Sequence, residues 1–217
     1  MCAPFFRWTT RWCRRLLRPT ECISKLSSRQ RNKPLSPACT DAISRSVKQA
    51  PSPQVAHYLC LTAIHQQART LVEFGTSHGY STLHLAAAAQ RTGGRVFSLD
   101  RVPEKTKAAQ ANLRQAGLDH LVECYTGEGD AFIAALPERV DFVFVDFGLP
   151  AFAPMFTMLE SRLVSGAFLF VDGWSKVEQW DQNQDWAAFR SRLDETADWL
   201  TYILPLEKSH LIAVKLA

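Results

Sequence analysis

The chain has 217 residues, of which 47% are hydrophobic and 21% are charged. These proportions are ordinary for a globular domain and exclude collagen-like and intrinsically disordered classes. The length suits one domain with a sizeable core, or one domain with an appendage. The six cysteines contain no CxxC pair. We therefore expect neither a disulfide framework nor a zinc site, and a reducing compartment such as the cytoplasm.

Positive charge is concentrated at the amino end of the chain. Residues 1–33 carry nine Lys and Arg against Glu21, a net charge of +8, whereas the whole chain carries +4, so the remainder carries about −4. Apolar residues recur at helical spacing within residues 1–20, with arginines on another face, which predicts a basic amphipathic helix. No run approaches the roughly 18 apolar residues of a membrane-spanning helix.

Three interpretations of this basic segment stay open. Residues 1–20 suit contact with an anionic membrane or partner surface. They also suit an organelle-targeting presequence, which is Arg-rich and poor in acids. The third interpretation is a helix that packs on the folded domain, or plain disorder. We expect no nucleic-acid binding, because the basic excess is confined to this segment.

Composition divides the chain into two parts. We expect residues 1–37 to form the basic amphipathic segment and a Ser-, Arg- and Pro-rich linker, and residues 38–217 to form the folded domain. Helices at 41–49 and 54–67 are expected to precede the core of this domain.

From Arg69 onward, short apolar runs alternate with helical stretches. The expected strands are 70–74, 95–99, 121–125, 140–145, 167–171, 199–204 and 211–216. The expected helices are 80–90, 103–115, 131–136, 153–162 and one within 185–196. This alternation predicts an α/β fold, with a doubly wound, mostly parallel, seven-stranded sheet. Only residues 205–210 join the last two strands, which leaves no room for a crossover helix, so we expect an antiparallel hairpin there.

A glycine-containing loop, EFGTSHGYST, follows the first expected strand. In an open parallel sheet the ligand crevice lies at the carboxyl ends of the strands. Gly75 and Gly79 allow close backbone approach to a ligand and positive φ angles, and Glu73 offers a carboxylate to a cationic amino group. The loop opens with an acid and lacks the third glycine of GxGxxG, which favours an amino acid and a ribose over a diphosphate. Taken alone, the loop also fits a simple tight turn.

Two further acids follow expected strands. Asp100 ends the second strand, where a carboxylate accepts the hydroxyl groups of a ribose. Asp130, in GEGDA after the third strand, is placed to accept a hydrogen bond from an adenine amino group. The alternative for Asp130 is an N-cap of the helix that follows.

At these residues the sequence resembles the class I SAM-dependent O-methyltransferases related to catechol and caffeoyl-CoA O-methyltransferases. The resemblance covers roughly residues 54–216 and includes DFVFVD at 141–146, GAFLFVDG at 166–173 and the closing hairpin. It implies the SAM-methyltransferase fold, S-adenosylmethionine (SAM) as cofactor, and methyl transfer to a small-molecule acceptor, at a hydroxyl oxygen. The cofactor-binding residues that it implies are Glu73, Gly75, Thr76, Ser77, Gly79, Ser81, Asp100, Gly129, Asp130 and Asp146.

The sequence departs from the metal-dependent members of that family at two positions. In those members the aspartate matching Asp146 is followed three positions later by a lysine, and the aspartate matching Asp172 is followed at once by an asparagine. Leu149 and Gly173 stand at these positions. Carboxylates suit a hard cation, but a site that lacks part of its shell loses affinity and orientation. We therefore expect a metal-independent or substrate-altered enzyme.

Asp146 is the expected catalytic residue, as a base or as the group that orients the acceptor. His78 is a secondary candidate, because its ordinary pKa lies near neutrality. Trp174, Trp180 and Trp186 suit either the wall of an aromatic acceptor site or the packing of helices.

Two other classes of function stay open beside methyl transfer. One is a nucleotide-cofactor oxidoreductase on a related fold, and the other is a non-catalytic methyltransferase-like binding module. A homodimer is a further expectation that stays open.

Overall fold

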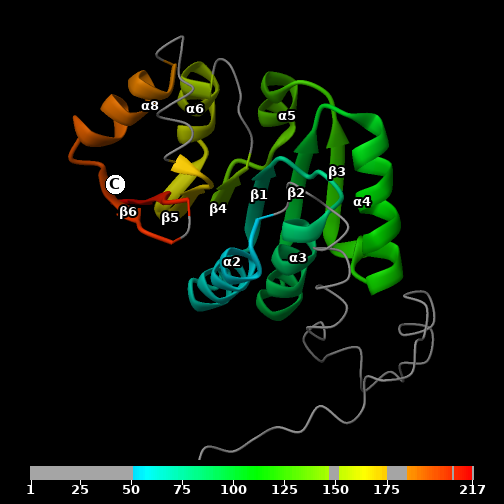
Figure 1. Cartoon of the computed structure of the whole chain (residues 1–217). Helices are drawn as coiled ribbons and strands as arrows, with labels where there is room; N and C mark the ends of the chain where they lie inside the picture. Colours follow the sequence, from blue (N-terminus) through cyan, green and yellow to red (C-terminus); the bar gives the residue numbers. More distant parts are fainter. Residues whose placement is uncertain (1–50, 147–151, 175–184, 207, 217) are drawn as a thin grey trace, which may run out of the picture. The chain divides into compact units, whose positions relative to one another are not determined.

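The computed structural model describes residues 51–146, 152–174, 185–206 and 208–216 (Figure 1). The amphipathic helix expected within residues 1–20 lies outside the described residues, as do the helix expected at 41–49 and the positions of Leu149 and Trp180.

Seven strands form one sheet in the order β3-β2-β1-β4-β5-β7-β6. The strands are β1 (Thr70–Phe74), β2 (Arg95–Asp100), β3 (Val122–Thr126), β4 (Val140–Val145), β5 (Leu163–Val171), β6 (Trp199–Leu204) and β7 (His210–Lys215). Strands β1 to β5 pair in parallel, and β7 runs antiparallel between β5 and β6. The expected doubly wound sheet with a closing antiparallel hairpin is confirmed.

Helices cover both faces of this sheet (Figure 1). They are α2 (Pro53–His65), α3 (Tyr80–Thr92), α4 (Pro103–Ala116), the 3-10 helix η2 (Asp119–Leu121), α5 (Gly129–Ala135), α6 (Phe152–Glu160) and α8 (Asp185–Asp194). Alternate residues of the central strands point to opposite faces. Leu71 and Phe142 thus pack with α2 and α3, whereas Val72 and Val143 pack with α5, α6 and α8.

Several element boundaries differ by one or two residues from those expected, and the start of β5 differs by four. Strand β5 begins at Leu163 rather than Ala167, because Leu163 pairs with Val140 across a register irregularity that the apolar run alone does not indicate. Helix α5 begins at Gly129, and its N-cap residue is Glu128. The alternative that Asp130 caps this helix is therefore wrong, since Asp130 lies inside its first turn.

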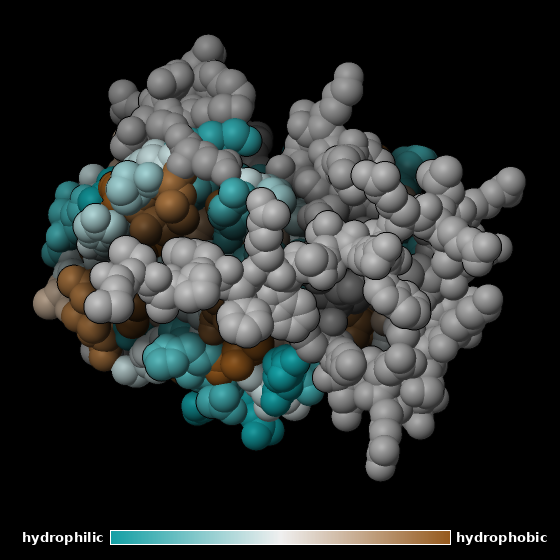
Figure 2. All heavy atoms as spheres, turned by 60° about the horizontal axis from the view of Figure 1, so that its bottom comes forward, coloured by the Kyte–Doolittle hydropathy of each residue, from teal (hydrophilic) through white to brown (hydrophobic). Residues whose placement is uncertain are grey.

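Exposed apolar side chains occur on both α2 and the edge strand β6. They include Leu61 of α2 and Leu200 and Tyr202 of β6. Figure 2 shows apolar surface in patches that hydrophilic residues interrupt. Within the described ranges, no helix is long and apolar enough to cross a membrane.

Candidate active site

The loop between β1 and α3 is hydrogen-bonded to β2 and lies close to the end of β4. The amides of Gly75 and Thr76 donate to the carbonyl oxygen of Leu99, at 2.9 and 3.0 Å. Gly75 has φ +111°, and a Cβ atom there would collide with the carbonyl oxygen of Asp146. Glycine is therefore required at position 75, because both the backbone conformation and the close approach of the β4 end exclude a side chain.

Gly79 sets where α3 begins. It has φ +86°, and a Cβ atom there would lie 3.0 Å from the Cβ atom of Ala109 in α4. The absence of a side chain thus lets the loop approach α4 closely. The two glycines chosen from the sequence pattern are accounted for by the geometry of this loop.

The carboxylate of Asp100 is fixed by the backbone around it. Its Oδ2 accepts a hydrogen bond from the Ser77 amide at 2.8 Å, and its Oδ1 accepts one from the Val102 amide at 2.9 Å. Asp100 is partly exposed, and each carboxylate oxygen has room for a further donor. The structure therefore brings Ser77 and Asp100 together, with a preoriented carboxylate at the tip of β2.

Glu73 lies beneath this loop and is completely buried. Its Oε2 accepts hydrogen bonds from the hydroxyl groups of Thr82 and Ser98, each at 2.5 Å. Its buried Oε1 has no partner among the described residues. Burial raises the pKa of Glu73 to about 7, the hydrogen bonds from Ser81, Ser98 and Thr82 oppose this rise, and the charge of Asp100 adds to it.

The surroundings of Glu73 include residues that the sequence analysis missed. Ser98 and Thr82 hold the carboxyl group, and the hydroxyl groups of Ser98 and Thr76 lie 2.5 Å apart. A polar residue inside the otherwise apolar run VFSL was the available signal for Ser98. An unpaired buried carboxylate oxygen is costly. The orphaned Oε1 therefore marks a position that a donor or a cation would satisfy.

The expected cofactor-binding residues that follow β3, Gly129 and Asp130, differ in their surroundings from the acids at the ends of β1 and β2. A Cβ atom on Gly129 would meet the terminal atoms of the Met155 side chain in α6, so Gly129 packs closely against that side chain. Asp130 is exposed in the first turn of α5. A contact of Asp130 with adenine stays a prediction.

Two carboxyl groups meet where β4 and β5 end. The Asp146 amide donates to the carbonyl oxygen of Phe74 at 2.9 Å, and the Asp172 amide donates to that of Val145 at 2.8 Å. Val145 is paired with Val171, so the two aspartates follow neighbouring strand ends. Burial raises the pKa of Asp146 to about 8, and the charges of Asp172 and then of Glu73 add to the rise.

The closing hairpin adds two basic residues to this pair. His210 is the buried first residue of β7, and its Nδ1 lies 2.9 Å from Oδ1 of Asp172. Lys208, in the turn before β7, lowers the pKa of Asp146. Sequence reasoning missed both residues. For His210 the signal was a polar residue at the start of the apolar run HLIAVK.

The contacts of His78, Trp174 and Trp186 are with residues other than Asp146 and Asp172. The Nδ1 atom of His78 is 3.3 Å from the hydroxyl of Ser77, and its carbonyl oxygen accepts a hydrogen bond from Asn112 at 2.8 Å. Trp174 and Trp186 are buried in the core shared with α6 and α8. These contacts favour a place in the cofactor loop for His78, and core packing for the two tryptophans.

The described residues contain no group of three or more His, Cys, Asp and Glu side chains that could hold a metal ion. Metal independence stays a prediction.

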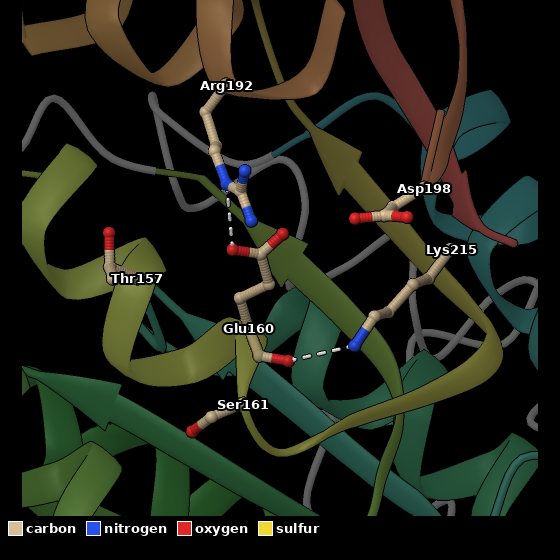
Figure 3. A pocket seen from close by; sticks show the side chains of 6 residues that line it. All are labelled: Thr157, Glu160, Ser161, Arg192, Asp198 and Lys215. Carbon is tan, nitrogen blue, oxygen red and sulfur yellow. Dashed lines mark hydrogen bonds and ion pairs between the residues drawn. The ribbon is translucent and has the colours of Figure 1, made fainter. Parts of the chain in front are cut away.

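A hollow at the opposite edge of the sheet is built differently (Figure 3). It is lined by Thr157, Glu160, Ser161, Arg192, Asp198 and Lys215. Glu160 accepts hydrogen bonds from Arg192 at 3.1 Å and from the indole of Trp199 at 2.9 Å. Lys215 donates to the carbonyl oxygens of Glu160 and Leu163, at 3.2 and 3.0 Å. These pairings tie α6, α8, β5, β6 and β7 together, so we assign the hollow a structural role.

Known proteins resemble this chain in sequence. Residues 72–174 match the family described as a methyltransferase domain. A catechol O-methyltransferase of Mycobacterium tuberculosis is 38% identical over 98 residues, which cover 45% of this chain and 44% of that protein. A catechol O-methyltransferase of Niastella koreensis is 33% identical over 109 residues, which cover 48% of this chain and 49% of that protein. The matched part thus spans about half the length of these curated relatives.

The likeness in structure is more extensive. The O-methyltransferase TomG from Streptomyces achromogenes superimposes with a TM-score of 0.71 at 24% identity, over 85% of this chain and 90% of that chain. The matched segment 72–174 runs from β1 through β5, so it includes the glycine loop, Asp100, Asp146 and Asp172. Residues 72–174 thus resemble a methyltransferase domain in sequence, and the chain shares the fold of the O-methyltransferase TomG.

Proposed function

We propose that the chain is a SAM-dependent methyltransferase that acts on a hydroxyl oxygen of a small molecule. The observation that carries the proposal is the position of Asp146. Asp146 follows the carboxyl end of β4, its backbone carbonyl lies directly beside Gly75 of the β1–α3 loop, and its carboxyl group has a raised pKa. A ligand crevice in this class of sheet opens at that edge.

The residues at this edge fit the parts of SAM. Asp100 presents a preoriented carboxylate for the ribose hydroxyl groups. The unpaired Oε1 of Glu73 offers a counter-charge beneath the loop for the amino group of the methionine part. The structural relative TomG was solved in complex with SAM, which supports the same choice of cofactor here. When bound, SAM supplies a methyl group that is activated by its sulfonium centre.

Asp146 supplies the proton chemistry. Methyl transfer is an in-line displacement, so the chain must hold the acceptor at near-attack distance and remove its proton. A base works best when its pKa is close to the working pH. The pKa of Asp146, near 8, meets that condition far better than an ordinary aspartate does.

The acceptor class follows from the curated relatives. Two of them are catechol O-methyltransferases, so we propose an aromatic hydroxyl compound. A reducing compartment such as the cytoplasm fits the free thiols of Cys60 and Cys124. A homodimer and membrane contact through residues 1–20 stay predictions, which sedimentation and flotation with anionic vesicles would test.

Two measurements test the proposed function. Isothermal titration calorimetry with S-adenosylhomocysteine (SAH) and with NAD(P) tests the cofactor, and release of SAH during incubation with SAM and a panel of catechols tests the reaction. We expect SAH binding, no NAD(P) binding and turnover with at least one catechol. Binding of NAD(P) in place of SAH would favour the oxidoreductase alternative. SAH binding without turnover on a broad acceptor panel would favour a non-catalytic module.

A further inference from the structure

We propose that His210 is a positioning residue, which holds Asp172 in its ionised form and thereby places the shared proton of the carboxyl pair on Asp146. The inference deepens the proposed function, because it assigns the residue that decides which of the two aspartates exchanges a proton.

The hairpin fixes His210 against Asp172. Strand β7 runs antiparallel to β5, and Leu211 is paired with Val171, so the preceding His210 lies across from Asp172. The two side chains approach to 2.9 Å between Nδ1 and Oδ1. The imidazole is 1% exposed, and its ring centre lies 5.0 Å from that of Phe170. Burial and this ring contact leave the imidazole little freedom to turn away.

The second ring nitrogen identifies the tautomer. Nε2 of His210 is buried, and the described residues offer it no partner. With the proton on Nε2, a buried N–H donor would be orphaned, which is rarer in proteins than an under-satisfied acceptor. With the proton on Nδ1, the ring donates a charge-assisted hydrogen bond to Asp172. The competing contact, from the Gly173 amide to Nδ1, is longer at 3.3 Å. The geometry therefore favours Nδ1–H.

The hydrogen bond that His210 donates to Asp172 determines which of the two aspartates, Asp146 or Asp172, holds a proton. Hydrogen bonding to a carboxylate stabilises its charged form, and two neighbouring buried carboxyl groups do not readily ionise together. Asp146 and Asp172 are such neighbours, because they follow the paired residues Val145 and Val171. Asp172, held by His210, keeps the charge, and Asp146 keeps the proton. The other charged groups that act on Asp146 are Glu73 from β1 and Lys208 from the turn before β7. These two act on Asp146 directly, whereas His210 acts through Asp172.

The first test uses the unaltered full chain. Long-range ¹H–¹⁵N correlation spectra of the ¹⁵N-histidine-labelled protein report which ring nitrogens carry protons, and the loss of one signal in His210→Asn assigns His210. We expect a protonated Nδ1. A neutral ring with its proton on Nε2 would overturn the proposal, and this result needs no variant to fold.

The second test compares two substitutions in protein labelled with ¹³C at the aspartate carboxyl groups. In His210→Phe the donor is lost, so Asp172 takes up the proton and Asp146 ionises at a pH lower by about one unit, a roughly tenfold change in its acid constant. In His210→Asn the side-chain amide replaces the Nδ1–H group, and we expect the Asp146 midpoint of the unaltered protein. An unchanged midpoint in folded His210→Phe would overturn the proposal.

Neither test depends on methyl transfer. Failure of the proposed function would be seen separately, as absent SAH binding or absent turnover of the unaltered protein, while the tautomer and the Asp146 midpoint still decide the role of His210.

Discussion

Carboxyl groups lie at both ends of the parallel strands, but their surroundings differ. Those near the amino ends, which we call the amino edge, have hydrogen-bond donors, whereas those at the carboxyl ends, the carboxyl edge, are buried beside one another. At the amino end of β1, Asp141 accepts hydrogen bonds from the amides of Arg69 and Thr70, both at 2.8 Å. At the start of β5, Glu160 is paired with Arg192 and Trp199. Both acids therefore have hydrogen-bond donors from neighbouring elements.

At the carboxyl edge, by contrast, carboxyl groups are buried beside one another. Glu73 has an oxygen without a partner among the described residues, and the neighbouring charge of Asp172 adds to the burial that raises the pKa of Asp146. Buried acids that lack sufficient donors cost folding free energy and are held where chemistry needs them. The comparison teaches that the same residue type stabilises the fold at one edge and is available for chemistry at the other.

The largest expected effect is at the carboxyl edge. Asp146→Asn removes the proposed base and preserves the shape of the site, so methyl transfer should fall by about 10²- to 10⁴-fold. SAH affinity, measured by calorimetry, should stay the same. The matched control is Asp119→Asn, at an exposed position in η2, which should leave turnover unchanged. Full turnover of Asp146→Asn would remove Asp146 from the catalytic role.

A substitution of Glu160, at the amino edge, should lower the stability of the fold. Glu160→Ala leaves the indole N–H of Trp199 and the Arg192 guanidinium without their acceptor, so the free energy of unfolding should fall by about 2 kcal/mol. Urea denaturation measures this loss, and SAH affinity should be retained in the folded protein. Glu160→Gln retains an acceptor and serves as the control with a smaller loss. Weaker SAH binding in both variants would contradict the separation of the two edges.

Glu73 should affect cofactor binding. Glu73→Gln preserves size but removes the counter-charge beneath the loop, so SAH affinity should fall by about tenfold, or about 1.4 kcal/mol. Calorimetry at pH 8, above the pKa of about 7, compares the ionised carboxylate with the amide. At pH 5.5 Glu73 is mostly protonated, and the difference between the two proteins should shrink. Equal affinities at pH 8 would show that Glu73 only supports the loop.

The smallest expected effect is a shift in pH dependence. An acid with a pKa near 8 is an active base only when ionised, so turnover of the unaltered protein should rise with pH through about 8. Lys208 lowers this pKa, and Lys208→Met should therefore move the midpoint to higher pH, by a fraction of a unit since exposed charges interact weakly. Lys107→Met, at an exposed position of α4, is the control. A midpoint that moves downward would contradict the assigned role of Lys208.

The sequence pattern predicted the order of the helices and strands and most of their bounds to within two residues. The expected bounds of β1, β4 and β6 agree with the structure, because each is a short apolar run between clear turn or helix signals. The start of β5 was missed, since Leu163 to Gly166 include exposed residues and lie at a register shift against β4. Local periodicity contains no information on such register shifts.

The site was predicted in part, for a physical reason. Gly75, Asp100 and Asp146 follow their own strands, so a parallel sheet necessarily brings them to one edge. His210 begins β7 and Lys208 lies in the turn before it, and their approach depends on the insertion of β7 between β5 and β6. Strand order is a property of the assembled sheet, and no local pattern near His210 specifies its partner.

The antiparallel direction of β7 bears on how substitutions could alter the proposed enzyme. A strand that runs against its neighbours delivers its beginning, rather than its end, to the reacting edge. Lys208 and His210, in and just after the short connection between β6 and β7, therefore reach the acid pair from a stretch of chain remote from residues 73–100, which surround the proposed cofactor position. Exchange of that short connection is a route to retune proton transfer while methyl-donor recognition is inherited intact.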